Sequence, residues 1–211
     1  MSNWINEHIV FQYDVKKQGA TNETLKESAY LQDLSGKGRR MKLNNFLFDM
    51  MSGIGKDNSL VTDGVDDYGL VENLSSGVKM LFMTVNPMML DRCLYDQRFT
   101  SGWHLFAVMT TSDKIAYNNY NTKGKTYING VLNESRTSNE LQNEKQIITI
   151  VNSEVNETNS LPPNFFRIRG GGLRIKCAFY NSIAFDSIPT EADGFTEQEL
   201  IDYVIDKYEL K

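Results

Sequence analysis

The stretch KMLFMTV, residues 79–85, is apolar on both of the faces that a β-strand would present, with polar side chains only at its first and sixth positions. Strands of this kind suit the middle of a sheet that is covered on both sides. Two further runs have a similar character, WHLFAVM at residues 103–109 and the β-branched QIITIV at residues 146–151. We therefore predict a β-rich protein in which these runs form central strands.

The composition is that of an ordinary globular protein. The 211 residues are 40% hydrophobic and 23% charged, and this length suits one all-β sandwich. Lysine and arginine number 22 against 27 aspartates and glutamates, a net charge of −5, which argues against a nucleic-acid binder, because phosphate neutralisation needs a basic field. Two cysteines and two histidines exclude a zinc ribbon, a disulfide framework and a multi-histidine metal centre. We expect Cys93 and Cys177 to be buried, reduced thiols.

Further strands follow from alternation and from turn residues. Residues 173–179 alternate apolar and polar side chains, which predicts a strand with one wet face, and Ile183 and Phe185 continue the same parity. The segment IVFQY, residues 9–13, is β-branched and aromatic. An Asn-Gly pair inside residues 126–132 predicts strand, tight turn and strand.

One helix is predicted at the end of the chain. Thr196 is a good N-cap, and Glu199 three residues later completes a capping box. An apolar stripe at helical spacing follows, made of Leu200, Ile201, Val204, Ile205 and Tyr208. We expect a helix over residues 196–208 that docks on the sandwich, with a partner-binding helix as the alternative. A shorter helical turn is expected within residues 22–30.

These elements define the expected organisation. We expect one domain over residues 1–211, with a sandwich core at about residues 31–205 and an N-terminal strand and helical turn at residues 7–30. Polar loops are expected at residues 118–121 and 152–164. Residues 1–7 are polar and acidic, and no apolar run approaches the roughly 20 residues that span a bilayer, so we expect neither a signal peptide nor membrane insertion.

The residue patterns that catalysis needs are weak. His8 and His104 are the two possible bases, and His104 lies in an apolar strand, which favours a packing role. Residues 53–57 lack the spacing and the hydroxyl of a phosphate-binding loop, and residues 169–172 lead into a strand, so they indicate a turn or bulge. Residues 191–196 lack the third acid of a sandwich glycosidase pattern. We expect no enzyme.

Three carboxylates cluster around one glycine. Asp63, Asp66 and Asp67 lie within five residues and could hold Ca²⁺. Their spacing does not fit an EF-hand loop, and Asx turns with solvated charge explain them equally well. Calcium is the one cofactor that the sequence suggests.

Several segments, taken in order, resemble the concanavalin A-like, laminin-G-type sandwich family. The similar segments are Leu31–Gly38 (D-x-S-G-x-G), Asn58–Tyr68 (D-G-V-D-D-Y), Trp103–Val108 (W-H-h-x-A-V, where h is hydrophobic), Tyr127–Gly130 (Y-h-N-G), Ile168–Gly170 and Ile183–Leu200. The chain departs from the family pattern at Thr62, at Arg169 and in the longer link at residues 189–194. The resemblance implies an all-β, antiparallel, two-sheet jelly-roll, and it supplies no functional residues.

The variant with MSGIG at residues 51–55 is similar to modules in virion proteins of phages of gut Bacteroides-type bacteria, including crAss-like phages. This similarity implies that the chain is part of a head fibre, a tail fibre or a capsid decoration. Such a protein is assembled in the host cytoplasm and located in the virion. A glycan could then stack on the aromatic rings of residues 117–121 and bond their amides, although a hydrated hairpin loop explains them too. The residues concerned are Tyr117, Asn118, Tyr120 and Asn121.

Two other functions remain open. The chain could be a purely structural virion subunit that docks through its methionines at residues 50–51 and 88–89, which could equally be core filler. The other open function is that of a glycan-active enzyme with the same fold. The expected partners are other virion proteins, further copies of this chain in a trimer, and a cell-surface glycan.

Overall fold

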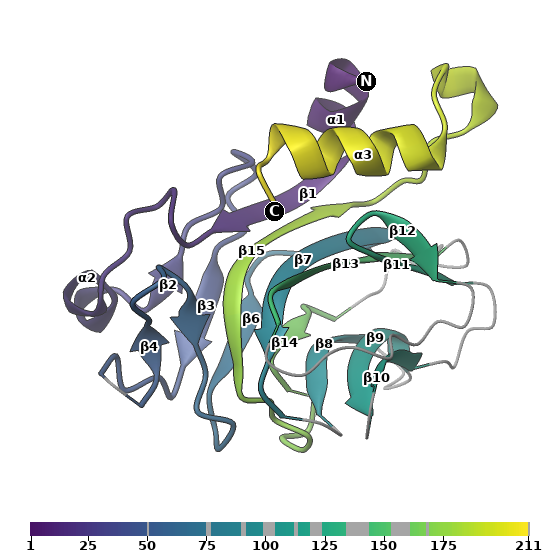
Figure 1. Ribbon diagram of the computed structural model, residues 1–211. Coiled ribbons are helices and arrows are strands. Elements are labelled where there is room, and N and C mark those ends of the chain that lie inside the picture. The colour runs from purple at the N-terminus through teal and green to yellow at the C-terminus, as the bar shows by residue number, and fades with distance from the viewer. Residues whose placement is uncertain are drawn as a thin grey trace.

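The computed structural model describes residues 1–49, 51–74, 77–89, 92–98, 104–111, 114–118, 124–133, 144–152, 161–167 and 169–210. It contains two antiparallel sheets, as predicted (Figure 1). The eight-stranded sheet has the order β12 (Val131–Asn133), β11 (Lys125–Ile128), β13 (Gln146–Val151), β7 (Met80–Pro87), β15 (Cys177–Phe185), β5 (Leu60–Val61) and β4 (Gly53–Ile54), with β1 (Ile9–Asp14) paired to β15. The seven-stranded sheet has the order β10 (Lys114–Asn118), β9 (His104–Thr111), β8 (Cys93–Arg98), β14 (Asn164–Phe165), β6 (Tyr68–Val71), β3 (Met41–Asn44) and β2 (Tyr30–Leu31).

The main core lies between the sheets and is rich in aromatic rings. Phe165 on β14 is fully buried, and its ring contacts five others, at centroid distances from 5.1 to 6.2 Å. Those rings belong to Phe11, Tyr13, Tyr95, Phe166 and Phe179. Edge-to-face and tilted packing of this kind adds stability beyond the apolar area that is buried.

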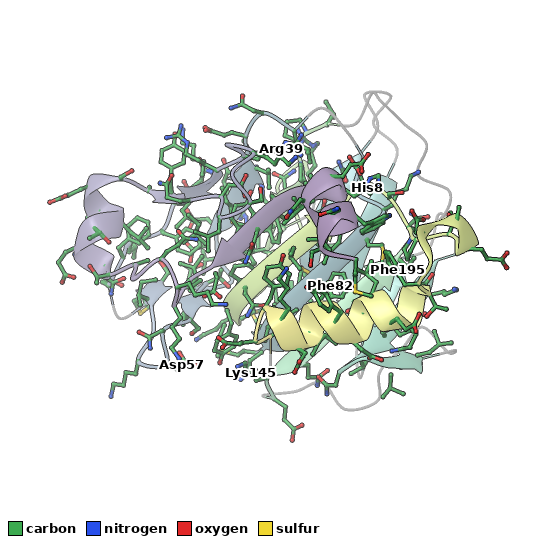
Figure 2. The ribbon with its side chains drawn as sticks, turned by 90° about the horizontal axis from the view of Figure 1, so that it is seen from above. His8, Arg39, Asp57, Phe82, Lys145 and Phe195 are labelled. Atoms are coloured by element: carbon green, nitrogen blue, oxygen red, sulfur yellow. The ribbon has the colours of Figure 1, made fainter. Side chains whose placement is uncertain are left out.

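A second core lies on the outer face of the eight-stranded sheet. Two helices cover part of this face, α1 (Ser2–His8) and α3 (Glu197–Lys207) (Figure 1). They bury the outward side chains of the central strands, such as Phe82 of β7 (Figure 2). Because β7 is covered on both faces, its apolar run is continuous, which confirms the prediction for residues 79–85.

The terminal helix begins and ends close to the predicted residues. The Thr196 hydroxyl accepts from the backbone N–H of Glu199, at 3.2 Å, and the Glu199 carboxylate accepts from the backbone N–H of Thr196, at 2.7 Å. The capping box is therefore confirmed, and the helix docks on the sandwich. The expected turn within residues 22–30 is α2 (Asn22–Glu27). α1 was not predicted, because only two of its residues, Trp4 and Ile5, are buried and they form no apolar stripe at helical spacing.

The prediction for the last strand was wrong in two respects. β15 begins at Cys177 rather than at residue 173, and Leu173 has a positive φ of 51° and is 40% exposed. In addition, Phe179 lies opposite Val85 whereas Asn181 lies opposite Thr84, so β15 carries one extra residue, a β-bulge at Tyr180. The bulge reverses the parity that the sequence suggested for Ile183 and Phe185, which face the helices.

The predicted turns are present. Asn129 and Gly130 both have positive φ, 51° and 85°, and join β11 to β12 as a tight hairpin. Gly170 and Gly171 also have positive φ and form a turn ahead of β15. A short 3₁₀ helix, Glu191–Asp193, precedes α3. Within the described ranges, no helix is both long enough and apolar enough to cross a membrane.

Candidate functional site

The glycan-binding residues predicted from the sequence are only partly described. Tyr117 and Asn118 are the last two residues of β10, opposite Val108 and Ala107 of β9, so they are strand residues rather than loop residues. Tyr120 and Asn121 lie outside the described residues, and so does Trp103, which we predict to be a core residue. A glycan site at residues 117–121 therefore stays a prediction.

The acidic turn between β5 and β6 brings its three carboxylates together. One carboxylate oxygen from each of Asp63, Asp66 and Asp67 lies within 4.8 Å of the others. Asp63 Oδ1 accepts from the backbone N–H groups of Val65 and Asp66, at 2.7 and 3.3 Å. Gly64 has a φ of +79°, and a Cβ there would lie 2.7 Å from the sulfur of Met89, so the turn requires glycine.

Asp67 is the buried member of the turn. It is 1% exposed, and its Oδ2 accepts from the backbone N–H of Asp63 at 2.8 Å, whereas its Oδ1 is buried and accepts no well-aligned hydrogen bond, although the Ser52 hydroxyl lies close to the carboxyl group. Burial raises the pKa of Asp67 to about 6, and the charge of Asp63 adds to the rise. Ca²⁺ binds several carboxylate oxygens at about 2.3–2.6 Å, so oxygens within this spacing fit one shared cation.

Two side chains that the sequence offered for catalysis, those of His8 and Asp193, have structural partners. His8 Nδ1 lies 3.1 Å from Asp186 Oδ1, and its ring packs 4.6 Å from that of Trp4. Asp193 accepts from the backbone N–H and the hydroxyl of Thr190, at 2.7 and 2.8 Å, and so caps the 3₁₀ helix. Cys93 and Cys177 are both buried, as predicted, and burial raises the pKa of the Cys177 thiol to about 12.

A polar cavity lies on the outer face of the eight-stranded sheet, beyond the C-terminal end of α3. Its volume is about 570 Å³, and its floor includes Tyr180 and Asn181 of β15. Three other parts of the chain form its walls: the end of β1 and the turn that follows, the β4–β5 turn with Asp57, and Glu209 after α3. Lys145, just before β13, closes another side, and Figure 2 shows Asp57 and Lys145 beyond that end of the helix.

Tyr180 is held in place by its hydroxyl group. The hydroxyl donates to Asp57 Oδ2 at 2.6 Å, and Asp57 Oδ1 accepts from the hydroxyl of Ser59, also at 2.6 Å. Burial and this bond to Asp57 raise the pKa of Tyr180 to about 12, so the phenol stays protonated at neutral pH. The ammonium of Lys145 lies over the ring, 4.8 Å from its centroid.

Asn181 leaves an acceptor unused at the floor of the cavity. The residue is 7% exposed, and its Oδ1 is buried with no hydrogen-bond partner. Asn181 lies opposite Thr84 of β7, whose hydroxyl donates to the carbonyl of Leu210 at 2.9 Å. The end of the chain thus covers the sheet up to Thr84, and the cavity opens next to it.

The formal charges around the cavity cancel, because three lysines and three carboxylates line it. Lys17 lies 3.7 Å from both Asp14 and Glu209. Among the described residues, Lys16 and Lys145 have no carboxylate partner. The cavity therefore offers both donors and acceptors without a strong net charge.

Sequence reasoning did not find this cavity, because its residues come from five separate segments. One signal was present. The apolar alternation of the last strand breaks at Tyr180 and Asn181, where a polar pair interrupts a buried strand. A break of this kind is typical of a β-bulge, and bulges are frequent beside functional sites.

Comparison with known proteins gives no relative. The chain matches no family model, none of the curated proteins and none of the solved structures.

Proposed function

We propose that this chain is a carbohydrate-binding module with a jelly-roll sandwich of the concanavalin A-like type. The observation that carries the proposal is the cavity at Tyr180, which places an aromatic ring beside amide and carboxylate groups. Binding sites for small polar molecules combine an apolar surface with a few directed polar groups. Each single site binds carbohydrate weakly, and the binding serves adhesion to a host surface or to mucus.

We assign the module to a phage virion, as part of a head or tail fibre or a capsid decoration. The resemblance of its segments to such modules supports this role. Weak glycan sites become effective when several are presented together, because linked sites raise the effective concentration. We therefore propose that the chain forms a homo-oligomer, specifically a trimer, and that this oligomer contacts other virion proteins. A strict monomer in light scattering at high concentration, absent from virions by mass spectrometry, would contradict this assignment.

Two alternatives differ in what they predict. A purely structural subunit would be present in virions and would bind no glycan. A glycan-active enzyme would release reducing ends from an oligosaccharide. The positions of Asp193 and His8 favour binding over catalysis, because both side chains have structural partners.

A glycan array tests the binding function directly. Purified chain, made multivalent on a fluorescent scaffold, is applied to immobilised neutral and acidic glycans, and the same glycans are then examined for cleavage. We expect weak, salt-tolerant binding to a subset of the glycans and no cleavage. A blank array for a protein that is present in virions would favour the structural alternative.

Calcium binding by the acidic turn is a second candidate function. The buried, unpaired Asp67 Oδ1 favours it, because an unpaired carboxylate oxygen is costly without a cation or a donor. Asp63, Asp66 and Asp67 would hold the ion. Isothermal titration with CaCl₂ should give a dissociation constant of about 0.1–1 mM, typical of extracellular modules. Asp66→Asn should weaken binding, whereas Asp206→Asn, an exposed acid on α3, should not.

A further inference from the structure

We propose that the cavity at Tyr180 binds one residue of a neutral saccharide, which lies against the Tyr180 ring and bonds Asn181 and Asp57. This inference rests on the proposed carbohydrate-binding function and adds the class of sugar and its contacts. The site lies at the β-bulge of β15, on the part of the outer sheet face that α1 and α3 leave uncovered.

The ring of Tyr180 is suited to a sugar. Its hydroxyl is fixed by Asp57, so the ring is oriented before a ligand arrives. The ring face under Lys145 carries a flexible ammonium group, whose own residue is exposed. A long lysine side chain can leave this face and donate to a sugar hydroxyl, while the C–H groups of the sugar take its place on the ring.

Asn181 supplies the specific polar contact. Its Oδ1 is a buried acceptor without a donor, a state that costs free energy in the empty protein. A rotation of the Asn181 side chain would turn this acceptor into the cavity, where a sugar hydroxyl would donate to it. Binding then removes a cost that the empty site carries, so this one amide should contribute measurably to affinity.

The charge balance selects a neutral sugar. Lys17 is already shared between Asp14 and Glu209. The carboxylate of Asp57 faces Tyr180 and would repel a second carboxylate placed on the ring. The two other lysines, Lys16 and Lys145, offset Asp57 and the excess negative charge of the group around Lys17, so the lining as a whole is neutral. An uncharged hexose, with many hydroxyl groups and one apolar face, satisfies these groups better than an acidic one.

The test uses four methyl glycosides and the full chain labelled with ¹⁵N. The neutral probes are the glucoside, the galactoside and the N-acetylglucosaminide, and the acidic probe is the glucuronide. Binding is followed by amide chemical shifts and by saturation transfer to the sugar protons. We expect at least one neutral glycoside to bind, with shifts centred on residues 178–183, and the glucuronide to bind at least about tenfold more weakly.

Variants locate the site. Tyr180→Ala should weaken binding at least about tenfold, and Tyr180→Phe by a smaller factor, because it keeps the ring and loses only the anchor on Asp57. Asn181→Ala should weaken binding by roughly two- to tenfold. It removes an unpaired acceptor, so it should not lower the stability of the free protein.

The matched control is Tyr30→Ala. Tyr30 lies under Arg40, with its ring 4.1 Å from the guanidinium carbon, and its hydroxyl bonds Glu72 at 3.3 Å. Tyr30 therefore has the same combination of aromatic ring, cation and carboxylate as Tyr180, but it lies outside this cavity. Tyr30→Ala should keep full affinity for the glycoside.

Each contrary result is decisive. Failure of every neutral probe to bind at 50 mM would overturn the inference, and so would a stronger response to the glucuronide. A positive glycan array that is unchanged in folded Tyr180→Ala would overturn the location alone and leave the carbohydrate-binding function standing. A blank array would overturn both.

Discussion

Phe179 and Ile183 are four residues apart on β15 and face opposite sides of the eight-stranded sheet. Phe179 packs in the core between the sheets, 5.7 Å from the Phe165 ring, whereas Ile183 packs under the helices. An unbroken strand would place both on one face. The bulge at Tyr180 is the cause, and it also makes Tyr180 part of the cavity. The same local irregularity therefore serves the packing of two cores and the candidate binding site.

Phe165 should be one of the most sensitive core positions. It is fully buried and contacts five aromatic rings, so Phe165→Ala should lower the free energy of unfolding by about 3–5 kcal/mol. Urea denaturation followed by circular dichroism measures this. Leu47→Ala is the control, because Leu47 is 57% exposed and its loss should change stability by less than about 0.5 kcal/mol. Equal effects for the two variants would contradict the assignment of this core.

The N-cap of α3 gives a second prediction. Thr196→Ala removes the hydroxyl that accepts from Glu199 N–H, and it should cost about 1 kcal/mol in unfolding free energy. Thr196→Ser keeps the acceptor and should recover most of the loss. An unchanged denaturation midpoint for Thr196→Ala would mean that this cap does not stabilise the helix.

Glu197 should hold α3 on the sheet. Its carboxylate accepts from the hydroxyl of Tyr127 on β11 and lies 3.1 Å from the ammonium of Lys125. Burial and the bond to Glu197 raise the pKa of Tyr127 well above its usual range, so the phenol donates at any ordinary pH. Tyr127→Phe should therefore cost about 1 kcal/mol. Lys125→Ala removes the more exposed partner and should cost less, and a double-mutant cycle with Glu197→Gln separates the two contributions.

Asp67 predicts a pH dependence of stability. Its pKa is about 6 in the folded chain, mainly because of burial, and near 3.9 when the chain is unfolded. Below about pH 4 both states are protonated. As the pH rises through this interval the unfolded state loses its proton first, so folding stability falls until the pH passes about 6.

Asp67→Asn removes this dependence. In EDTA at pH 7 the variant should be more stable than the parent by about 1–3 kcal/mol, and the difference should shrink towards pH 4. Thermal unfolding at pH 4, 5, 6 and 7 measures it. Asp66→Asn, at a more exposed position of the same turn than Asp67, is the control and should stay within about 0.5 kcal/mol of the parent. A gap that widens on acidification would contradict the raised pKa.

The two-sheet β architecture and several elements could be predicted from the residues alone, because their causes are local. Residues 79–85 and 146–151 are mostly apolar at consecutive positions and rich in β-branched or aromatic side chains, which favours strands covered on both sides. The cap of α3 and the hairpin at Asn129 depend on side chains and backbone angles within a few residues. Such short-range chemistry can be predicted from the residues that take part in it.

Other features depend on contacts between segments that are far apart in the sequence. The parity of β15 depends on one extra residue opposite β7, and a slip of one residue moves every later side chain to the other face. α1 is stable because Trp4 and Ile5 are buried in the second core, on the outer face of the eight-stranded sheet. The cavity joins Tyr180 to Asp57, 123 residues away in the sequence, and to Lys145. Its chemistry arises from contacts between segments, and no local pattern encodes which segments meet.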